Sequence, residues 1–280
     1  MIHFGRRALL AACASGLLTL GFAQTPTAAP AARARKRILV IGQTKGYQHD
    51  SVPVAMAMIW KWGHDTGLWD AYLRTDTELL TNQKFENNTK TLPDFDALVF
   101  ASPTGEMDLS DQQRADLLGF VREAGNGFVG IHASADSNYK WADYGLLTGG
   151  WFDEHPWGTF EAPIILEDPD FPAVRHFPKA FLKRDEIYQL KNWSRDNVNV
   201  LLRLDESKLN YDNPRIHRGD RDFAVAYAKM YGKGRVFYST LGHTTESWDD
   251  PDIQKLYFEA IRWALGMTEG STRPHPRPAR

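Results

Sequence analysis

The chain has 280 residues, of which 42% are hydrophobic and 24% are charged, a balance typical of a globular protein. Its formal net charge of −2 excludes the basic surplus of a nucleic-acid-binding protein, so we expect no nucleic-acid partner. The single cysteine, Cys13, excludes a scaffold stapled by disulfides.

The first residues have the pattern of an export signal. Arg6 and Arg7 precede an apolar stretch over residues 8–22 that is short for a membrane span, and small residues flank Phe22. We therefore predict a signal peptide over residues 1–23 and a flexible, Pro- and Ala-rich lead-in over residues 24–35. The protein is expected to be exported, periplasmic or secreted, without stable membrane insertion after processing. The general and twin-arginine export routes both stay open.

The first half of the remaining chain alternates between strand and helix patterns. Short apolar runs over 37–42, 96–101 and 128–131 are typical of buried parallel strands. Between them, Ser51 and Ser110 stand at the start of amphipathic, helix-like stretches. This alternation with short connections predicts an α/β fold with a doubly wound, mostly parallel sheet.

The second half departs from that alternation. Strand patterns follow one another without long helices at 162–166, 186–190, 198–204, 223–227 and 235–239. The last two flank a Tyr-Gly-Lys-Gly segment at 231–234, which predicts a hairpin. A final helix is expected from about residue 251 to 266. We predict one domain over residues 36–267 with an antiparallel insertion or extension, followed by a disordered tail over 268–280.

A turn after the strand at 128–131 is the most informative local feature. The apolar run ends in Gly130-Ile131-His132, the place where a nucleophile elbow carries Ser or Cys at the top of a parallel sheet. An imidazole at this position indicates an active-site architecture without acyl-enzyme chemistry.

Four histidines follow predicted strands or turns: His49, His132, His155 and His243. Because ligand clefts in open α/β sheets lie at the carboxyl ends of the strands, we expect the four imidazoles to gather there. Together with Glu186 or Asp153 they are candidate ligands for Zn²⁺ or another divalent metal. Each of them alone also fits an ordinary packing residue.

Several motifs together resemble one family. They are Gly-Tyr-Gln-His-Asp-Ser at 46–51, Gly-Ile-His-Ala at 130–133, Gly-Gly-Trp-Phe at 149–152 with His155, Asp-Glu-Ile-Tyr at 185–188, and the segment from Tyr231 to His243. With them, residues 36–266 resemble the ThuA-like (trehalose utilisation) proteins, relatives of the class I glutamine amidotransferases. The resemblance implies a flavodoxin-like sheet and a small-molecule sugar as partner.

The resemblance also suggests candidate site residues. Amidotransferases of this class use a Cys at the elbow and a later His and Glu; here His132, His243 and Glu246 match those positions. Without the thiolate, glutaminase chemistry is excluded, and His132 and His243 become candidate catalytic acid–base groups, with Glu246 orienting His243. The candidate substrate-binding residues are Tyr47, His49, Asp50, Trp151, His155 and Glu186.

The family is associated with disaccharide pathways that pass through 3-keto sugars. A keto group acidifies the neighbouring C–H bond, so a His/Glu site could promote elimination, hydrolysis or isomerisation of a disaccharide or its 3-keto derivative. Metal-assisted chemistry at the same histidines is the other enzymatic interpretation. A carbohydrate-binding module with a degenerate amidotransferase-like site is the non-catalytic alternative.

Overall fold

The computed structural model describes residue 1 and residues 35–277. The predicted signal peptide and the lead-in up to residue 34 lie outside this range, apart from Met1. The strands are β1 (Lys36–Ile41), β2 (Trp69–Arg74), β3 (Ala97–Ala101), β4 (Gly127–Ile131), β5 (Trp151–Glu154), β6 (Thr159–Leu166), β7 (Ala180–Glu186), β8 (Gln189–Lys191), β9 (Asn199–Leu204), β10 (Ala224–Tyr231) and β11 (Gly234–Ser239). The helices are α1 (Ser51–Thr66), α2 (Asp111–Arg122), α3 (Ala142–Thr148) and α4 (Pro251–Ala264).

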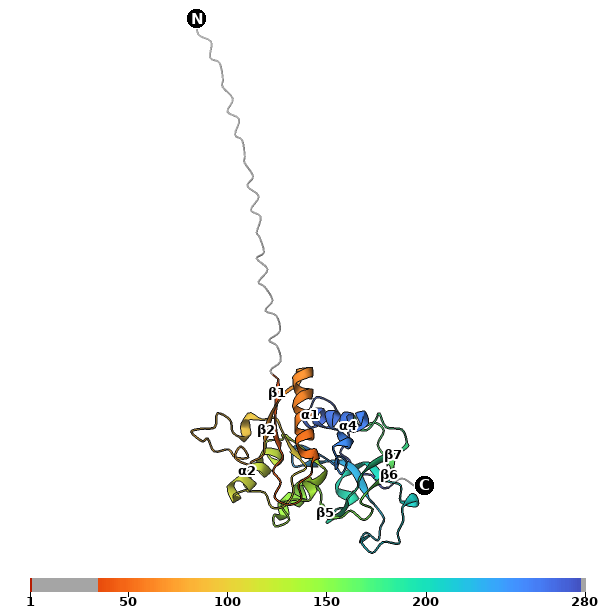
Figure 1. Ribbon diagram of the computed structural model, residues 1–280. Helices are drawn as coiled ribbons and strands as arrows, with labels where there is room; N and C mark the ends of the chain where they lie inside the picture. Colours follow the sequence, from red (N-terminus) through yellow and green to blue (C-terminus); the bar gives the residue numbers. More distant parts are fainter. Residues whose placement is uncertain (2–34, 278–280) are drawn as a thin grey trace. The chain divides into compact units, whose positions relative to one another are not determined.

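Within the described residues, one sheet has the strand order β2-β1-β3-β4-β11-β10-β9-β6-β7. Figure 1 shows β1 and β2 in one part of the domain and β6 and β7 at its other side. The first five strands in this order pair in parallel. The remaining four pairings, from β11 outward to β7, are antiparallel. The molecule is therefore an α/β protein with a mostly parallel sheet, and the predicted antiparallel part is an extension of that sheet along one edge.

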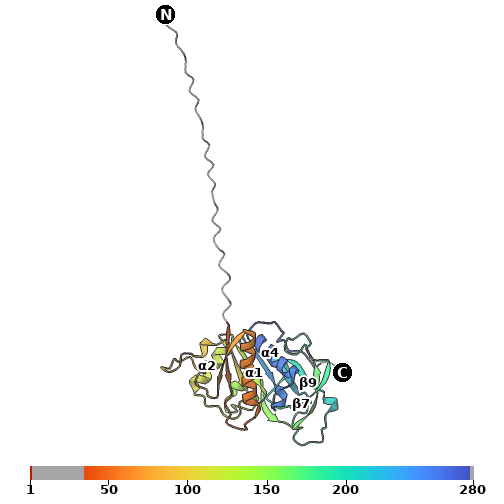
Figure 2. The same cartoon turned by 45° about the horizontal axis from the view of Figure 1, so that its top comes forward.

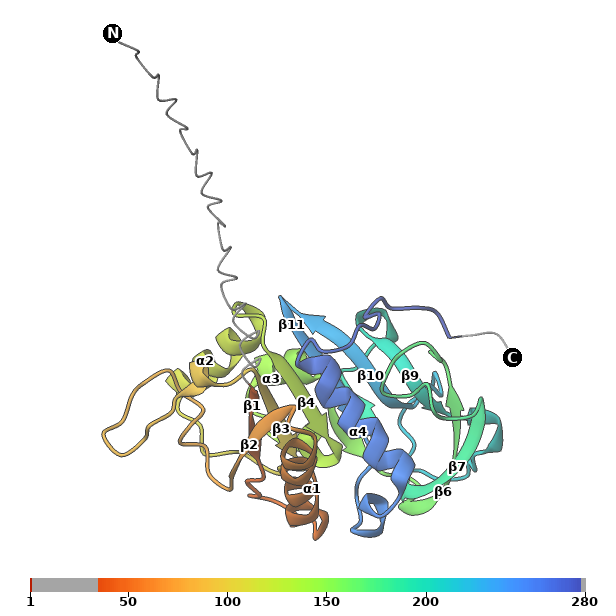
Figure 3. The same ribbon diagram turned by 90° about the horizontal axis from the view of Figure 1, so that it is seen from above.

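Helices cover both faces of the parallel half because its strands are apolar on both sides. Ile38 and Val40 of β1 pack in the same core cluster as α1 and α4. Leu39 and Ile41, on the other face of the same strand, pack with α2 and α3. Figures 2 and 3 show α1 and α4 next to each other on one side of the sheet. His49, His132 and His243 all follow the carboxyl ends of parallel strands, namely β1, β4 and β11.

The predicted strands of the parallel half are confirmed, and the hairpin turns at Gly232-Lys233 between β10 and β11. The prediction of one strand over 186–190 was wrong: β7 ends at Glu186 and β8 begins at Gln189 in a separate two-stranded sheet with β5. The elements β2, α3, β5 and all of β7 except its last residue were missed. They are short or carry mixed polar residues, and their patterns are weak in the sequence alone.

Residues 268–277 were expected to form part of a disordered tail, but they contact the domain. The Ser271 carbonyl accepts a hydrogen bond from Asn199, and the His275 ring contacts the Val200 carbonyl at 3.0 Å. The Thr268 carbonyl accepts a bond from Arg235. Among the described residues, no helix is both long and apolar enough to cross a membrane.

Candidate active site

The turn after β4 is a strained elbow centred on His132. Its φ of 42° lies in the left-handed region, which a residue with a side chain adopts only where its surroundings hold it there. Gly130 permits the turn, because a Cβ there would lie 2.6 Å from Ser134 Oγ. The Tyr238 hydroxyl donates to the His132 carbonyl (2.9 Å), and His132 Nδ1 donates to the Thr240 carbonyl (2.5 Å). The sequence prediction of an elbow is confirmed in this geometry.

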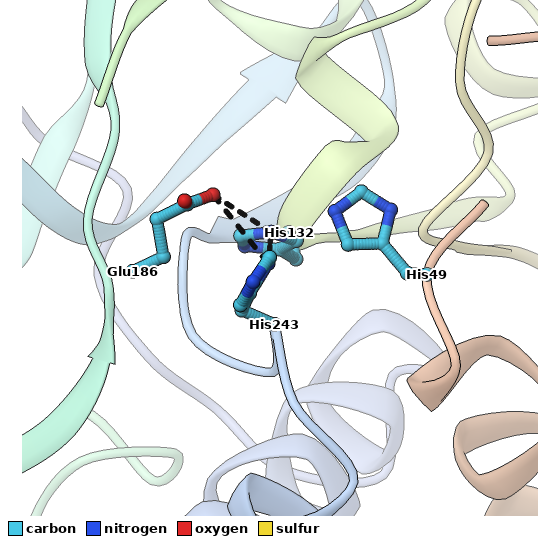
Figure 4. Close-up of side chains that lie close together, drawn as sticks. All are labelled: His49, His132, Glu186 and His243. Carbon is cyan, nitrogen blue, oxygen red and sulfur yellow. Dashed lines mark hydrogen bonds and ion pairs between the residues drawn. The ribbon is translucent and has the colours of Figure 1, made fainter. Parts of the chain in front are cut away.

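Three further side chains converge on the buried His132 ring (Figure 4). His49 comes from the loop after β1, His243 from the loop after β11, and Glu186 is the last residue of β7. One ligand atom from each of the four residues lies within 4.8 Å of the other three. We call these four residues the His/Glu cluster.

The hydrogen-bonding of the elbow fixes the roles of the His132 ring nitrogens. Because Nδ1 donates to a carbonyl, Nε2 of the neutral ring carries the lone pair. Nε2 lies 3.1 Å from His243 Nδ1, 2.9 Å from the Tyr188 hydroxyl and 3.7 Å from Glu186 Oε2. The cluster is therefore centred on a lone pair that points toward the other members.

Asp185, fully buried beside the cluster, ties its backbone together. The Asp185 carboxylate accepts hydrogen bonds from the backbone N–H groups of Gly242 (2.8 Å), His243 (3.0 Å) and Glu186 (2.8 Å). One side chain thus holds the loop after β11 against the end of β7. Burial raises the pKa of Asp185 to about 6, against the opposing effect of these hydrogen bonds.

Burial keeps the imidazoles of the cluster neutral. It lowers the pKa of His49 to about 4, with a further contribution from His243. Burial, followed by the neighbouring His49 and His243, lowers the pKa of His132 well below its usual value. The pKa of His243 is also lowered, mainly by burial. Burial raises the pKa of Glu186, while His155 opposes this shift. The site therefore holds neutral rings, each with a ring-nitrogen lone pair, beside a carboxyl group.

A cavity of about 340 Å³ opens above the cluster, large enough for a small sugar. Its lining residues are Tyr47, His49, Asp136, Phe152, His155, Glu186, Tyr188 and His243. Sequence reasoning missed Asp136, Phe152 and Tyr188 as lining residues. Asp136 could have been found from its place directly after the elbow turn. Burial raises its pKa, although its Oδ1 accepts a bond from Tyr139 (2.5 Å).

The structure brings most of the predicted binding residues to this cavity. Tyr47, His49 and Glu186 line it, as does His155, whose Nδ1 lies 3.5 Å from Glu186 Oε1. Asp50 is exposed at the start of α1 and is not part of the lining.

Two predicted positions lie elsewhere. Trp151 packs in the core against Leu147 and over Gly145, because alternation along β5 turns Phe152, not Trp151, toward the cavity. Glu246 was expected to orient His243, but it lines a separate surface pocket with Arg184. The carboxylate near His243 is that of Glu186, with Oε2 3.4 Å from His243 Nδ1.

A comparison with protein families matches residues 37–264 to the ThuA model, described as trehalose utilisation. The chain belongs to the ThuA family. Solved ThuA-like relatives have the same fold: the protein from Bacteroides uniformis has a TM-score of 0.69 and 20% identity over 89% of this chain and 98% of its own. The protein from Parabacteroides merdae has a TM-score of 0.63 and 17% identity over 86% and 93%.

A further structural match is a cytoplasmic protein from Salmonella typhimurium, with a TM-score of 0.51 and 14% identity over 82% of this chain and 98% of that chain. No curated protein matches the sequence. Family membership links the chain to trehalose utilisation, hence to sugar metabolism.

Proposed function

We propose that this ThuA-family protein is an enzyme that cleaves a disaccharide, in its 3-keto form, by elimination at the cavity above the His/Glu cluster. The observation that carries the proposal is the convergence of buried, neutral imidazoles and carboxyl groups on one sugar-sized cavity. Ionisable groups clustered in this way are typical of sites that move protons.

The reaction needs a group that stabilises negative charge on the keto oxygen. A base removes the proton from the carbon between the keto carbon and the anomeric carbon, and the electron pair moves onto the keto oxygen as an enolate. His243 of the His/Glu cluster lines the cavity, and its ring N–H donates a hydrogen bond to this oxygen as the charge develops. Such stabilisation contributes strongly in a buried site. His132 has no exposed surface, so it acts on the substrate through His243, 3.1 Å away.

The base and the acid are also residues of the cavity wall. Glu186 and Asp136 are the lining carboxylates, and burial raises the pKa of both, which makes them stronger bases than a solvated carboxylate. When the enolate collapses, the keto C=O bond re-forms, a double bond forms between the anomeric carbon and the deprotonated carbon, and the bond from the anomeric carbon to the glycosidic oxygen breaks. His155, which also lines the cavity, is the acid that gives its proton to that oxygen.

The test is incubation of the purified protein with a panel of disaccharides and their 3-keto forms. The proposal predicts loss of the keto substrate and release of a free monosaccharide. His243→Gln should lower turnover by about 10²–10⁴-fold, the usual contribution of a proton-transfer group or its electrostatic equivalent. His64→Gln is the matched control, because His64 stacks on Trp60 at the surface and lies outside the cavity. Binding of the panel without any turnover would instead support a carbohydrate-binding module.

We also propose that the protein is exported. The proposal rests on the sequence of residues 1–23, where two arginines precede a short apolar stretch and small residues. N-terminal sequencing of the protein from each cell fraction tests it. A periplasmic or secreted form starting near residue 24 supports export, and a cytosolic form that keeps Met1 contradicts it.

A further inference from the structure

The His/Glu cluster has the dimensions of a metal site. His132 Nε2, His243 Nδ1 and Glu186 Oε2 are separated by 3.1, 3.4 and 3.7 Å. Ligands about 2.1 Å from a tetrahedral Zn²⁺ ion lie about 3.4 Å from one another. His49 completes the set, because a ring nitrogen of His49 falls within the 4.8 Å limit that encloses all four ligand atoms.

The hydrogen bonds around the cluster are those expected around metal ligands. A ligating histidine usually donates its second ring N–H to a carbonyl or carboxylate, and His132 Nδ1 does so to Thr240. His49 is more than nine-tenths buried, and its Nδ1 has no hydrogen-bond partner. A buried ring with an unsatisfied nitrogen is costly unless something else takes up its bonding capacity.

We propose that His49, His132, His243 and Glu186 together bind one first-row divalent metal ion of the Zn²⁺ class. Three neutral imidazoles and one carboxylate are a ligand set that such ions accept. Neither Lys nor Arg is among the cavity's lining residues, so no fixed cation there competes with the ion. In the metal-free site the Tyr188 hydroxyl donates a hydrogen bond to His132 Nε2. This hydrogen bond breaks when the ion binds, because the ion takes the lone pair of Nε2.

The metal inference rests on the proposed function and assigns its electrophile. Held by these four residues, the ion would supply Lewis-acid chemistry, that is, polarisation of the keto oxygen and stabilisation of the negative charge that develops on it. Glu186 is then committed through Oε2 to the ion, which leaves Asp136 as the base that takes the proton. His155 stays outside the ligand set and keeps its role as the acid.

The experiment uses the untagged full-length chain, because a polyhistidine tag would bind metal by itself. The protein is treated with a chelator, dialysed, and titrated with Zn²⁺ by calorimetry and with Co²⁺ by visible absorption. We expect one equivalent per chain and a Co²⁺ spectrum with imidazole and carboxylate coordination. His49→Gln and His243→Gln should weaken Zn²⁺ binding by at least about 100-fold, since even residues behind the ligands cost about 10–100-fold. His64→Gln should bind like the wild type.

Circular dichroism confirms that each variant is folded before its titration is compared. If the variants fail to fold, the wild-type Co²⁺ spectrum decides alone. Less than a tenth of an equivalent bound by the wild type, a Co²⁺ spectrum of a fully hydrated ion, or unchanged affinity in both folded variants would overturn the inference. Turnover of a keto disaccharide by the metal-free protein would reject the catalytic role of the ion and leave the proposed function standing. Metal binding without turnover of any sugar would reject the proposed function and leave the metal site standing.

Discussion

Asp185 is the residue whose replacement tests how the site is held together. Its carboxylate is fully buried and accepts three backbone hydrogen bonds, from Gly242, His243 and Glu186. Oδ1 serves His243 and Glu186, whereas Oδ2 serves Gly242. In Asp185→Asn the amide oxygen can keep the two bonds of Oδ1, but the NH₂ group then faces the Gly242 N–H and that donor loses its partner.

The expected cost follows from the number of donors left unpaired. One buried backbone donor without a partner costs about 1–3 kcal/mol, so Asp185→Asn should lower the free energy of unfolding by that amount. Asp185→Ala leaves three such donors and should cost at least about 3 kcal/mol. Without this carboxylate, the backbone of Glu186 and of His243 is no longer held in place. A shift of these reacting groups by about 1 Å should reduce turnover by about 100-fold.

Urea unfolding measures the stability of each variant, and Zn²⁺ titration with keto-sugar turnover measures its site. Asp116→Asn is the matched control: Asp116 is a buried carboxylate that accepts bonds from Thr81, Asn82 and Gln112, and none of these residues lines the cavity. We expect a comparable loss of stability in the control with an intact site. Asp185→Asn with wild-type Zn²⁺ affinity and turnover would refute the positioning role of Asp185.

Three other predictions concern the elbow, the extension and the cavity rim. Gly130→Ala should lower the free energy of unfolding in urea by about 1–3 kcal/mol, because its Cβ would lie 2.6 Å from Ser134 Oγ. Gly219→Ala is the control, because the space around Gly219 is open. Equal unfolding free energies of the two variants would contradict the elbow geometry. Burial lowers the pKa of Lys229 to about 8, so the unfolded chain binds more protons and stability should rise with pH from about 8 toward 10. Between pH 7.5 and 9.5 the wild type should gain about 2 kcal/mol relative to Lys229→Met, and parallel pH profiles of the two proteins would argue against this effect. Tyr47 lines the cavity and is 66% exposed. Tyr47→Ala should therefore raise KM about 2- to 10-fold, because stacking of the ring on the sugar is lost, with little change in kcat or stability. A fall in kcat with unchanged KM would instead assign Tyr47 a part in the chemical step.

The sequence predicts the parallel half of the fold because that information is local. Continuous apolar runs such as 97–101 are buried on both faces and end at recognisable turns. The elbow at His132 is local as well, because Gly130 and the strand before it are adjacent in the chain. The short helix α3 and the edge strand β2 carry no comparable local signal, and packing against their neighbours defines them.

The errors in the site arise where tertiary contacts decide. Trp151 and Phe152 are adjacent, and only the register of β5 determines which of them faces the cavity. Glu246 is three residues from His243, but the carboxylate near that ring belongs to Glu186, brought by β7 from 57 positions away. The role of Asp185 could not be read from the sequence, because its three backbone partners include a loop more than fifty residues distant.

Hydrogen exchange at the substrate tests the central claim, proton abstraction beside the keto group, most directly. A 3-keto disaccharide is incubated in D₂O with the wild type, with His243→Gln or with His64→Gln, and mass spectrometry and NMR follow deuterium at the carbon between the keto and anomeric carbons. The account predicts enzyme-dependent loss of that proton with the wild type and the His64 variant, and a rate at least about 100-fold lower with His243→Gln. Exchange no faster than in buffer for every keto disaccharide tested, or equal exchange by His243→Gln, would contradict it.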